Sequence, residues 1–297
     1  MTAVDGGLGH RGVVELSANL KNAGYLADRG LATAAYIALE LGRPLLLEGE
    51  VGVGKTELAK TLAAVFHCPL IRLQCYEGID THQALYEWDY ARQMLHVRAL
   101  SEAEVHDENA VNRLFSEDFL LERPLLEAVK KGGECVLLID EIDRADDEFE
   151  AFLLELLSDF QVTIPEVGTI RAESPPMVVL TSNRTRELHD ALKRRCLYHW
   201  IDYPTAEQEL AIIQARCPET PELLAQKVVN AVHRLRERDL VKPPGIAETL
   251  DWVAALAVIE SKDLSAQDAH DTLGSVIKDR DDLTDVASDI AIVIADG

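Results

Sequence analysis

Residues 49–56 constrain the fold of this chain more than any other segment. They are Gly49, Glu50, Val51, Gly52, Val53, Gly54, Lys55 and Thr56. This order matches the pattern G-x-x-x-x-G-K-[ST], which stands between a strand and a helix in proteins that bind nucleotides. Here the apolar run 44–47 precedes the pattern and the helix-forming stretch 57–64 follows it. The sequence therefore predicts a phosphate-binding loop, the P-loop, in a strand–loop–helix unit.

The P-loop predicts that the chain binds ATP and Mg²⁺. Backbone N–H groups of such a loop, with the positive end of the following helix, surround phosphate oxygens. We expect nucleotide contacts along the loop and the first helical turn: Gly49, Glu50, Val51, Gly52, Val53, Gly54, Lys55, Thr56 and Glu57. Lys55 is expected to reach the β- and γ-phosphates, and the hydroxyl of Thr56 to bind Mg²⁺. ATP is favoured over GTP because the sequence contains no N-K-x-D motif for guanine.

A pair of acids stands at the end of the apolar run 136–139. Asp140 and Glu141 follow this run directly. A carboxylate at the end of a buried strand, downstream of a P-loop, is placed to support Mg²⁺, which is the role predicted for Asp140. Glu141 is the predicted general base that orients the attacking water. The alternative is that the acids only make a strand end soluble, and the upstream P-loop disfavours it.

Polar residues also stand at the end of the next apolar strand, 177–183, and after it. The neutral amide of Asn183 is predicted to contact the γ-phosphate or the attacking water. Arg194 and Arg195 come shortly afterwards. One of them is predicted to reach the nucleotide of a neighbouring subunit and to stabilise the transferring phosphoryl group. The alternatives are an ordinary turn residue at Asn183 and a solvated basic pair.

Charge and composition limit the partners of the chain. Its 297 residues carry a formal net charge of −23. Acidic surfaces repel duplex DNA and anionic membranes, so we expect no nucleic-acid partner. No apolar run approaches the roughly 20 residues of a transmembrane segment, the five cysteines form no C-x-x-C pair, and no signal peptide is evident. We therefore expect a cytoplasmic protein, with peripheral contact to a membrane left open.

The order of apolar and helical patterns predicts an α/β fold with a parallel sheet. Strands are predicted at 45–48, 69–75, 134–140 and 177–183, with helices at 55–66 and 148–160. Further helices are predicted at 205–216, 221–238 and 246–260. We expect a disordered N-terminus at 1–12, a nucleotide-binding α/β domain at 13–203, a small helical domain at 204–277 and an acidic tail at 278–297. The tail is either a terminal helix or a frayed end.

Two segments predict β-hairpin inserts in the α/β domain. Alternating β-forming residues at 86–98 predict a hairpin that interrupts a helix, and two β-rich runs within 161–171 predict a second one. Their apolar side chains are Tyr86, Trp88, Tyr90, Ile164, Val167 and Ile170. Exposed apolar side chains on such inserts often mark an interaction surface. The alternative, local packing under the hairpins, stays open.

Together these motifs resemble the AAA+ ATPases over about residues 25–260. In this resemblance 49–56 is Walker A, 136–141 is Walker B, Asn183 is sensor 1 and Arg195 is the arginine finger. Arg195 is favoured over Arg194 because Arg195 and Cys196 look like a Ser-Arg-Cys finger motif. The family implies a P-loop core with a parallel sheet, a C-terminal helical lid and a homo-oligomer, normally a hexameric ring.

The run 140–145 is similar to the D-E-I-N-R-A motif of the MoxR group, with Asp143 in place of Asn. The segments 73–78 and 86–88 look most like CoxD-like members. This resemblance implies a chaperone that remodels or matures a metalloenzyme, usually with a von Willebrand factor A domain partner. For CoxD-like members the client is a molybdenum hydroxylase of the carbon monoxide dehydrogenase type.

One position departs from the MoxR pattern, which places a sensor 2 arginine at the start of a lid helix. Ala247 stands there in this chain, and Lys242 is a candidate substitute. Two other functions remain as alternatives. A nucleic-acid motor or loader is disfavoured by the acidic composition, and a scaffold that binds but barely hydrolyses nucleotide is disfavoured by Glu141.

Overall fold

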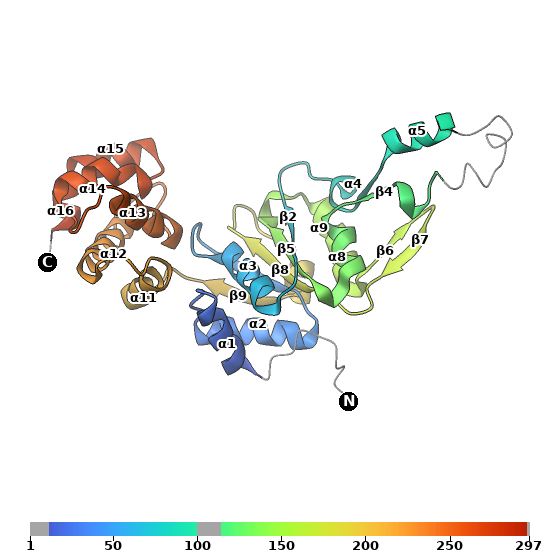
Figure 1. Cartoon of the computed structure of the whole chain (residues 1–297), viewed down its shortest axis with the longest axis horizontal. Helices are drawn as coiled ribbons and strands as arrows, with labels where there is room; N and C mark the ends of the chain where they lie inside the picture. The colour runs from blue at the N-terminus through green and yellow to red at the C-terminus, as the bar shows by residue number, and fades with distance from the viewer. Residues whose placement is uncertain (1–11, 100–113, 296–297) are drawn as a thin grey trace. The chain divides into compact units, whose positions relative to one another are not determined.

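The computed structural model describes residues 12–99 and 114–295, so the N-terminus predicted to be disordered lies outside the described residues except for Gly12. The chain divides into two compact units (Figure 1). The first contains the segments 29–48 and 59–199, with residues up to Leu16. The second contains 17–28, 49–58 and everything from Trp200 onward. The P-loop is thus grouped with the C-terminal helices, although it follows the first strand of the sheet.

A five-stranded sheet with the strand order β2-β5-β8-β1-β9 forms the centre of the α/β fold. The strands are β1 (Leu45–Gly49), β2 (Leu70–Gln74), β5 (Val136–Asp140), β8 (Met177–Ser182) and β9 (Leu197–Ile201). Pairing of β1 with β8, β8 with β5 and β5 with β2 is parallel. Every residue of β1, β5 and β8 is buried, as continuous apolar runs predict for a covered parallel sheet. The predicted fold class is confirmed.

Helices precede and connect these strands along the chain. They are α1 (Val13–Asn22), α2 (Arg29–Leu41), α3 (Lys55–Phe66), α4 (Thr81–Ala84), α8 (Pro124–Lys131), α9 (Asp147–Asp159) and α10 (Asp190–Arg195). Helix α9 begins at the N-cap Asp146, whose carboxylate accepts a hydrogen bond from the N–H of Phe149. It ends at Phe160, which is in a left-handed conformation. Its apolar face, Phe149, Leu153, Leu156 and Leu157, joins the main core cluster.

The insert predicted as a hairpin at 86–98 is a strand followed by a helix. Strand β3 (Tyr86–Trp88) pairs antiparallel with β4 (Leu120–Glu122), and α5 (Tyr90–Ala99) follows β3 directly. Asp89 causes the change because its carboxylate and carbonyl oxygens accept hydrogen bonds from the N–H groups of Arg92 and Gln93, which starts a helix. The prediction of a hairpin within 86–98 was therefore wrong.

The second insert is a hairpin, as predicted. Strand β6 (Gln161–Ile164) pairs antiparallel with β7 (Gly168–Arg171). Ile164 is fully buried, and Val167 and Ile170 pack against the main core. The apolar side chains of this hairpin are engaged in local packing, which was the alternative to an interaction surface.

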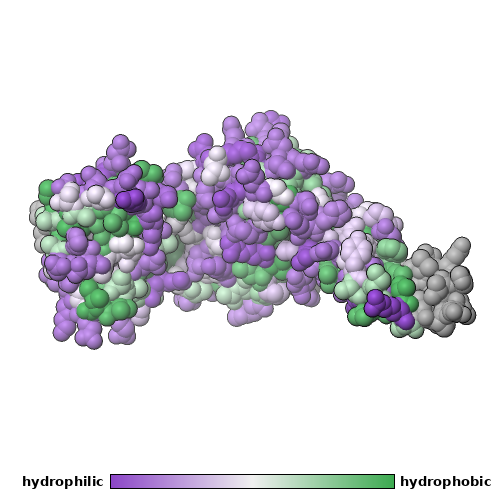
Figure 2. Space-filling view, turned by 90° about the horizontal axis from the view of Figure 1, so that it is seen from above, coloured by the Kyte–Doolittle hydropathy of each residue, from purple (hydrophilic) through white to green (hydrophobic). Residues whose placement is uncertain are grey.

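Exposed apolar side chains gather instead on α5. Tyr90, Met94, Leu95 and Val97 of this helix are all exposed, and hydrophobic colour appears beside the grey residues in Figure 2. Smaller hydrophobic areas also appear over the C-terminal helices and in the middle of that view, between hydrophilic ones. Among the residues of α5, only Gln93 is buried. Helix α5 thus exposes its apolar side chains, whereas the β6–β7 hairpin packs Ile164, Val167 and Ile170 against the core.

The C-terminal segment of the second unit is entirely helical. Its helices are α11 (Ala206–Arg216), α12 (Glu222–Arg236), α13 (Ile246–Val258), α14 (Ala266–Thr272), α15 (Arg280–Ser288) and α16 (Ile290–Ile294). They share a core around the fully buried Trp252. Val286, Ile290 and Val293 are buried in that core. The described part of the acidic tail is therefore helical and docked, and the frayed end is excluded there.

Candidate nucleotide site

The P-loop folds around the amino group of Lys55. This side chain is only 6% exposed, and its Nζ donates hydrogen bonds to the carbonyl oxygens of Gly49 and Glu50 at 2.7 and 2.6 Å. Gly52 and Gly54 have φ values of 79° and 94°. Residues with a side chain rarely adopt this left-handed region, so the backbone favours glycine at both positions, of which only Gly54 is fixed by the pattern. Helix α3 begins at Lys55, which brings the positive end of a helix to the loop, as phosphate binding requires.

Parallel pairing places three loops at one edge of the sheet. Glu48, the residue before the P-loop, lies opposite Ser182, the residue before Asn183. On the other side of β8, Thr181 donates a hydrogen bond of 2.6 Å to Asp140 at the end of β5. The starting points of the P-loop, of the Asn183 loop and of the Asp140–Glu141 turn are therefore neighbours, as expected for ligand sites of open α/β sheets.

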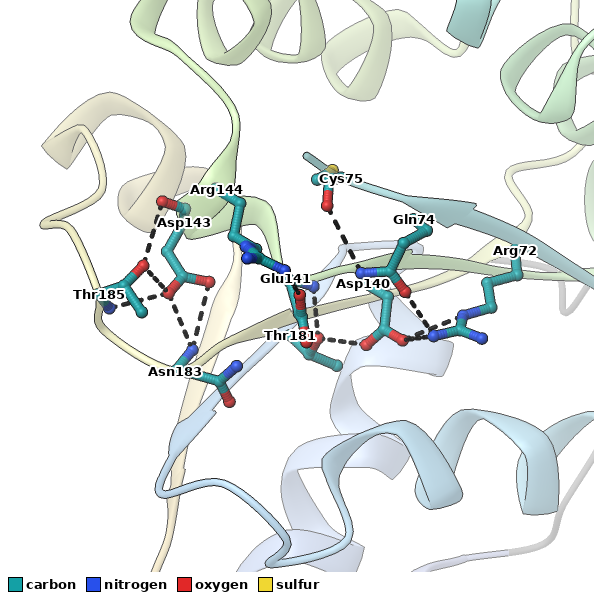
Figure 3. A network of polar contacts seen from close by, with 10 residues as sticks. All are labelled: Arg72, Gln74, Cys75, Asp140, Glu141, Asp143, Arg144, Thr181, Asn183 and Thr185. Atoms are coloured by element: carbon teal, nitrogen blue, oxygen red, sulfur yellow. Dashed lines mark hydrogen bonds and ion pairs between the residues drawn. The ribbon is translucent and has the colours of Figure 1, made fainter. Parts of the chain in front are cut away.

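Asp140 is a buried carboxylate, and both of its oxygens accept hydrogen bonds from neighbouring side chains (Figure 3). Its Oδ1 accepts the bond from Thr181, and its Oδ2 accepts bonds from Nε and Nη2 of Arg72 at 3.0 and 2.6 Å. A buried charge without such partners is strongly unfavourable. The role of Arg72 was not predicted, since nothing in the apolar strand around it shows that the side chain points to the neighbouring strand end.

The two predicted metal ligands carry donor atoms that suit Mg²⁺. Carboxylate and hydroxyl oxygens are the ligands that this ion takes, and it usually keeps several waters and phosphate oxygens besides one or two carboxylates. Asp140 offers the carboxylate, and Thr56 in the first turn of α3 offers the hydroxyl. The predicted metal ligands therefore carry suitable chemistry.

Glu141 is held in a turn that directs it away from the strand. Its φ and ψ are 54° and 51°, a left-handed conformation. Its N–H donates to Thr181 Oγ1 at 2.9 Å, and its carboxylate forms an ion pair with Arg144 at 3.0 Å. Because Thr181 binds both acids, one hydroxyl fixes the geometry of Asp140 and Glu141 together.

Asp143 links this turn to the Asn183 loop. It is 3% exposed and accepts hydrogen bonds from the N–H of Asn183, and from the N–H and hydroxyl of Thr185 at 2.8 and 2.7 Å. Among the ten residues drawn in Figure 3, the side-chain amide of Asn183 carries no dashed contact. Sequence comparison marked Asp143 only as a replacement for Asn and missed this bridging role.

The two candidate arginines lie at the opposite edge of the sheet. Arg194 and Arg195 end α10, and the next residue but one, Leu197, donates its N–H to the carbonyl oxygen of Pro44 at 2.8 Å. Pro44 precedes β1, whereas the P-loop follows it. The five residues of β1 correspond to about 17 Å at a rise of about 3.3 Å per residue. These arginines therefore lie at the end of β1 opposite to the end from which the chain continues into the P-loop.

Residues outside the predicted set also contact the P-loop within the second unit. The hydroxyl of Tyr25 donates to the carbonyl oxygen of Gly54 at 3.4 Å. Burial raises the pKa of Tyr25, and the carboxylates of Asp28 and Glu57 raise it further. Glu57, predicted to contact nucleotide, forms an ion pair with Arg216 at 3.0 Å. The isolated Tyr25 carried no sequence pattern that predicts this contact.

The start of α13, where the MoxR pattern places a sensor 2 arginine, packs on the loop through its backbone and the carboxylate of Glu248, which lies beside Gly52. The N–H of Ala247 donates to the carbonyl oxygen of Gly52 at 3.2 Å. A Cβ on Gly245 would lie 2.7 Å from the Cα of Gly52 and from the carbonyl oxygen of Val51. Lys242 uses its backbone N–H to bind Asp282.

Comparisons with known proteins agree with this architecture. The family model described as AAA domain (dynein-related subfamily) matches residues 44–196, just over half of the chain. The uncharacterized protein YojN of Bacillus subtilis is 27% identical over 261 residues, which are 85% of this chain and 77% of that protein. An uncharacterized protein of Staphylococcus epidermidis is 26% identical over 246 residues, covering 80% and 84%.

Two further similarities concern a named regulator and a solved structure. The denitrification regulatory protein NirQ of Pseudomonas aeruginosa is 26% identical over 211 residues, which are 67% of this chain and 70% of that protein. A mutant RuvB of Thermotoga maritima superposes with a TM-score of 0.50 at 18% identity and covers 92% of this chain and 75% of that one. At that identity the similarity concerns the fold alone. Within the described residues, no helix is long and apolar enough to cross a membrane.

Proposed function

The chain belongs to the dynein-related subfamily of AAA domains, and from that premise we propose that it is a Mg²⁺-dependent ATPase that works as a homo-oligomer to remodel another protein. The observation that carries the ATPase is the shared sheet edge, where the P-loop, Asp140–Glu141 and Asn183 all begin. Each of these positions carries the residue type that phosphoryl transfer requires.

Each residue of this edge receives one role in the proposal. The P-loop amides and Lys55 bind the phosphates, and Thr56 and Asp140 support Mg²⁺, which neutralises phosphate charge when it is bound. Glu141 takes the proton of the attacking water as general base. The amide of Asn183 orients that water or the γ-phosphate. Thr181 and Asp143 keep these groups in place through the hydrogen bonds described above.

A homo-oligomer is supported by the position of the arginines. Phosphoryl transfer in this class gains a large factor from an arginine that contacts the transition state. Arg194 and Arg195 stand at the far end of β1 from their own P-loop, so they serve the site of a neighbouring subunit. Head-to-tail contacts of this kind close into rings, and we propose a hexamer.

The proposed client is a metalloenzyme. This step rests on the MoxR-like and CoxD-like segments of the sequence, which imply maturation of a molybdenum hydroxylase with a von Willebrand factor A domain partner. The name of one relative, denitrification regulatory protein, is compatible with an accessory role of this kind. Helix α5 supplies the contact surface in this proposal, because it exposes Tyr90, Met94, Leu95 and Val97.

Affinity capture tests the proposal. The Glu141→Gln protein, which keeps nucleotide but loses the general base, is purified from its native host with ATP present. We expect a metalloenzyme and its partner to be retained, and retention to fall when ATP is omitted or when Met94 and Leu95 are changed to serine. Co-purification of nucleic acid, with salt-sensitive stimulation of ATP hydrolysis by DNA, would instead identify a nucleic-acid motor.

A further inference from the structure

Arg43 stands where the chain turns from α2 into β1. Helix α2 ends at Gly42, which has a φ of 58°. The N–H of Gly42 donates to the carbonyl oxygen of Leu39 at 3.2 Å, and the N–H of Arg43 donates to that of Ala38 at 3.0 Å. These two bonds form a Schellman motif, a common way for a helix to end. Pro44 then restricts the backbone on the other side, so the starting point of the Arg43 side chain is fixed.

The guanidinium group of Arg43 binds the end of α10. Its Nε donates to the carbonyl oxygen of Arg195 at 3.1 Å. Its Nη2 donates to the carbonyl oxygens of Arg194 and Cys196 at 2.8 and 3.3 Å. The last carbonyl groups of a helix have no partner within that helix, and a cation near them is stabilising. One side chain thereby holds three consecutive peptide groups, at the position of the candidate arginine finger.

Arg43 binds the backbone of both Arg194 and Arg195, but the side chains of these two arginines differ in their contacts. Nε of Arg195 donates to Ser158 Oγ at 2.8 Å, and its Nη1 donates to the carbonyl oxygen of Ala191 at 3.3 Å. Arg195 therefore folds back onto α9 and α10. Arg194 is exposed, and its side chain forms no hydrogen bond or ion pair across residues 12–99 and 114–295. Of the pair, Arg194 alone is ready to contact another molecule without breaking a bond.

We propose that Arg43 is a positioning residue for the intersubunit site, and that Arg194 is the arginine it presents to the nucleotide of the neighbouring subunit. The inference rests on the proposed function, because it presupposes an arginine that acts in trans. It departs from the finger motif of the sequence, which favours Arg195. The planar fork of an arginine is needed at position 43, since several N–H groups must reach carbonyl oxygens in a fixed geometry.

Subunit mixing tests the inference, because it separates a residue that acts on a neighbour from one that acts on its own chain. Arg43→Ala, Arg194→Ala and Arg195→Ala subunits are each measured alone and after mixing with Lys55→Ala subunits. A Lys55→Ala subunit has a defective P-loop but an intact arginine end. In an equimolar ring about a quarter of the interfaces pair that intact end with an intact P-loop.

We expect Arg43→Ala alone to lose about a hundredfold in ATP turnover, since misplacement of a catalytic group by about 1 Å has an effect of that size. Mixing should restore turnover for Arg43→Ala and for Arg194→Ala, whereas Arg195→Ala alone should stay near wild type. The ATP affinity of the Arg43→Ala subunit should not change, because Arg43 and the P-loop stand at opposite ends of β1. A residue that only stabilised the fold would show no recovery on mixing.

Three outcomes overturn parts of the argument separately. Failure of all arginine variants to recover, despite confirmed mixing, would remove the trans site and with it the proposed function. Recovery of Arg194→Ala without recovery of Arg43→Ala would leave that function intact and overturn the positioning role. A defect and recovery confined to Arg195→Ala would overturn the choice of Arg194.

Two further variants keep the test decisive. Arg43→Lys, which retains the charge but lacks the fork, should give turnover between wild type and Arg43→Ala, and it replaces Arg43→Ala in the mixing test if the alanine variant does not fold. Arg280→Ala removes an exposed arginine at the start of α15 and serves as the matched control, with turnover equal to wild type.

Discussion

The carboxylate of Asp143 accepts the hydroxyl hydrogen bond of Thr185 at 2.7 Å and so joins the turn after β5 to the loop after β8. Two backbone N–H groups, those of Asn183 and Thr185, donate to the same carboxylate. The turn that carries the predicted catalytic residue Glu141 and the loop that carries the predicted sensor Asn183 are therefore connected through the buried side chain of Asp143. Asp143 was not among the predicted site residues.

Replacement of Asp143 by alanine should lower both stability and turnover. The change leaves partly buried N–H groups without an acceptor, for which we expect about 1–3 kcal/mol of lost unfolding free energy. Asp143→Asn keeps a side-chain oxygen and should recover most of both properties. Urea unfolding and steady-state hydrolysis measure the effects, with the exposed Asp271→Ala as control. Wild-type turnover of a folded Asp143→Ala protein would contradict the link.

Replacement of Lys55 by alanine should abolish nucleotide binding. The loop folds around this ammonium group. Removal of the group therefore removes two hydrogen bonds that stabilise the loop and also the cation that is expected to pair with phosphate. Titration with a fluorescent ATP analogue measures the affinity, and Lys262→Ala, on an exposed loop, is the control. Micromolar affinity retained by Lys55→Ala would remove the loop from the binding site.

The Glu141→Gln variant should bind ATP like wild type while its turnover falls by about 10²–10⁴-fold, the usual contribution of a general base. An amide keeps the size of the side chain and cannot accept the proton of water. Binding and single-turnover hydrolysis are measured on the same preparation, with Glu260→Gln beyond α13 as control. Undiminished hydrolysis would show that another group is the base.

Replacement of Gly245 by alanine should push α13 away from the P-loop. Its Cβ would meet the backbone of Gly52 and Val51 at 2.7 Å, and overpacking of this kind typically costs about 1–3 kcal/mol of unfolding free energy. We expect a lower melting temperature and a changed ATP affinity together. Gly274→Ala is the matched control, because a Cβ there has no atom within 4 Å. Equal behaviour of the two variants would argue against the close contact.

The thiol of Cys75 should resist alkylation at neutral pH. Burial raises its pKa to about 12, and the carboxylates of Asp140, Asp143 and Glu141 add to the shift. Since only the thiolate reacts, about one molecule in 10⁴ is reactive at pH 8, and the rate should rise with pH. Mass spectrometry after iodoacetamide treatment compares Cys75 with the half-buried Cys217. Rapid labelling of Cys75 in the folded protein would contradict this environment.

The sequence alone predicted those elements that are determined by residues close to one another in the chain. The continuous apolar runs of β1, β5 and β8 predicted buried parallel strands, and the glycine pattern predicted the loop between β1 and α3. The hairpin β6–β7 was also predictable, because its two strands are neighbours in sequence and Gly168 adopts the left-handed conformation that such a turn requires.

The remaining features depend on partners distant in sequence. Strand β3 pairs with β4, about thirty residues later, so the alternating pattern at 86–98 could not show that the chain turns into a helix at Asp89. Likewise, Arg72 binds Asp140 and Arg43 binds the end of α10 only because the strands are ordered as they are. The contacts of these side chains follow no fixed spacing in the sequence, so a sequence motif does not reveal them.

Because of the length of β1, the proposed ATPase activity should depend on the protein concentration. A lone subunit holds its nucleotide at one end of a five-residue strand and its arginines at the other, and no rotation of a side chain spans about 17 Å. Dilution below the concentration at which rings assemble would then leave ATP bound but not hydrolysed. The rate per subunit should rise steeply once rings form, so that hydrolysis itself reports assembly.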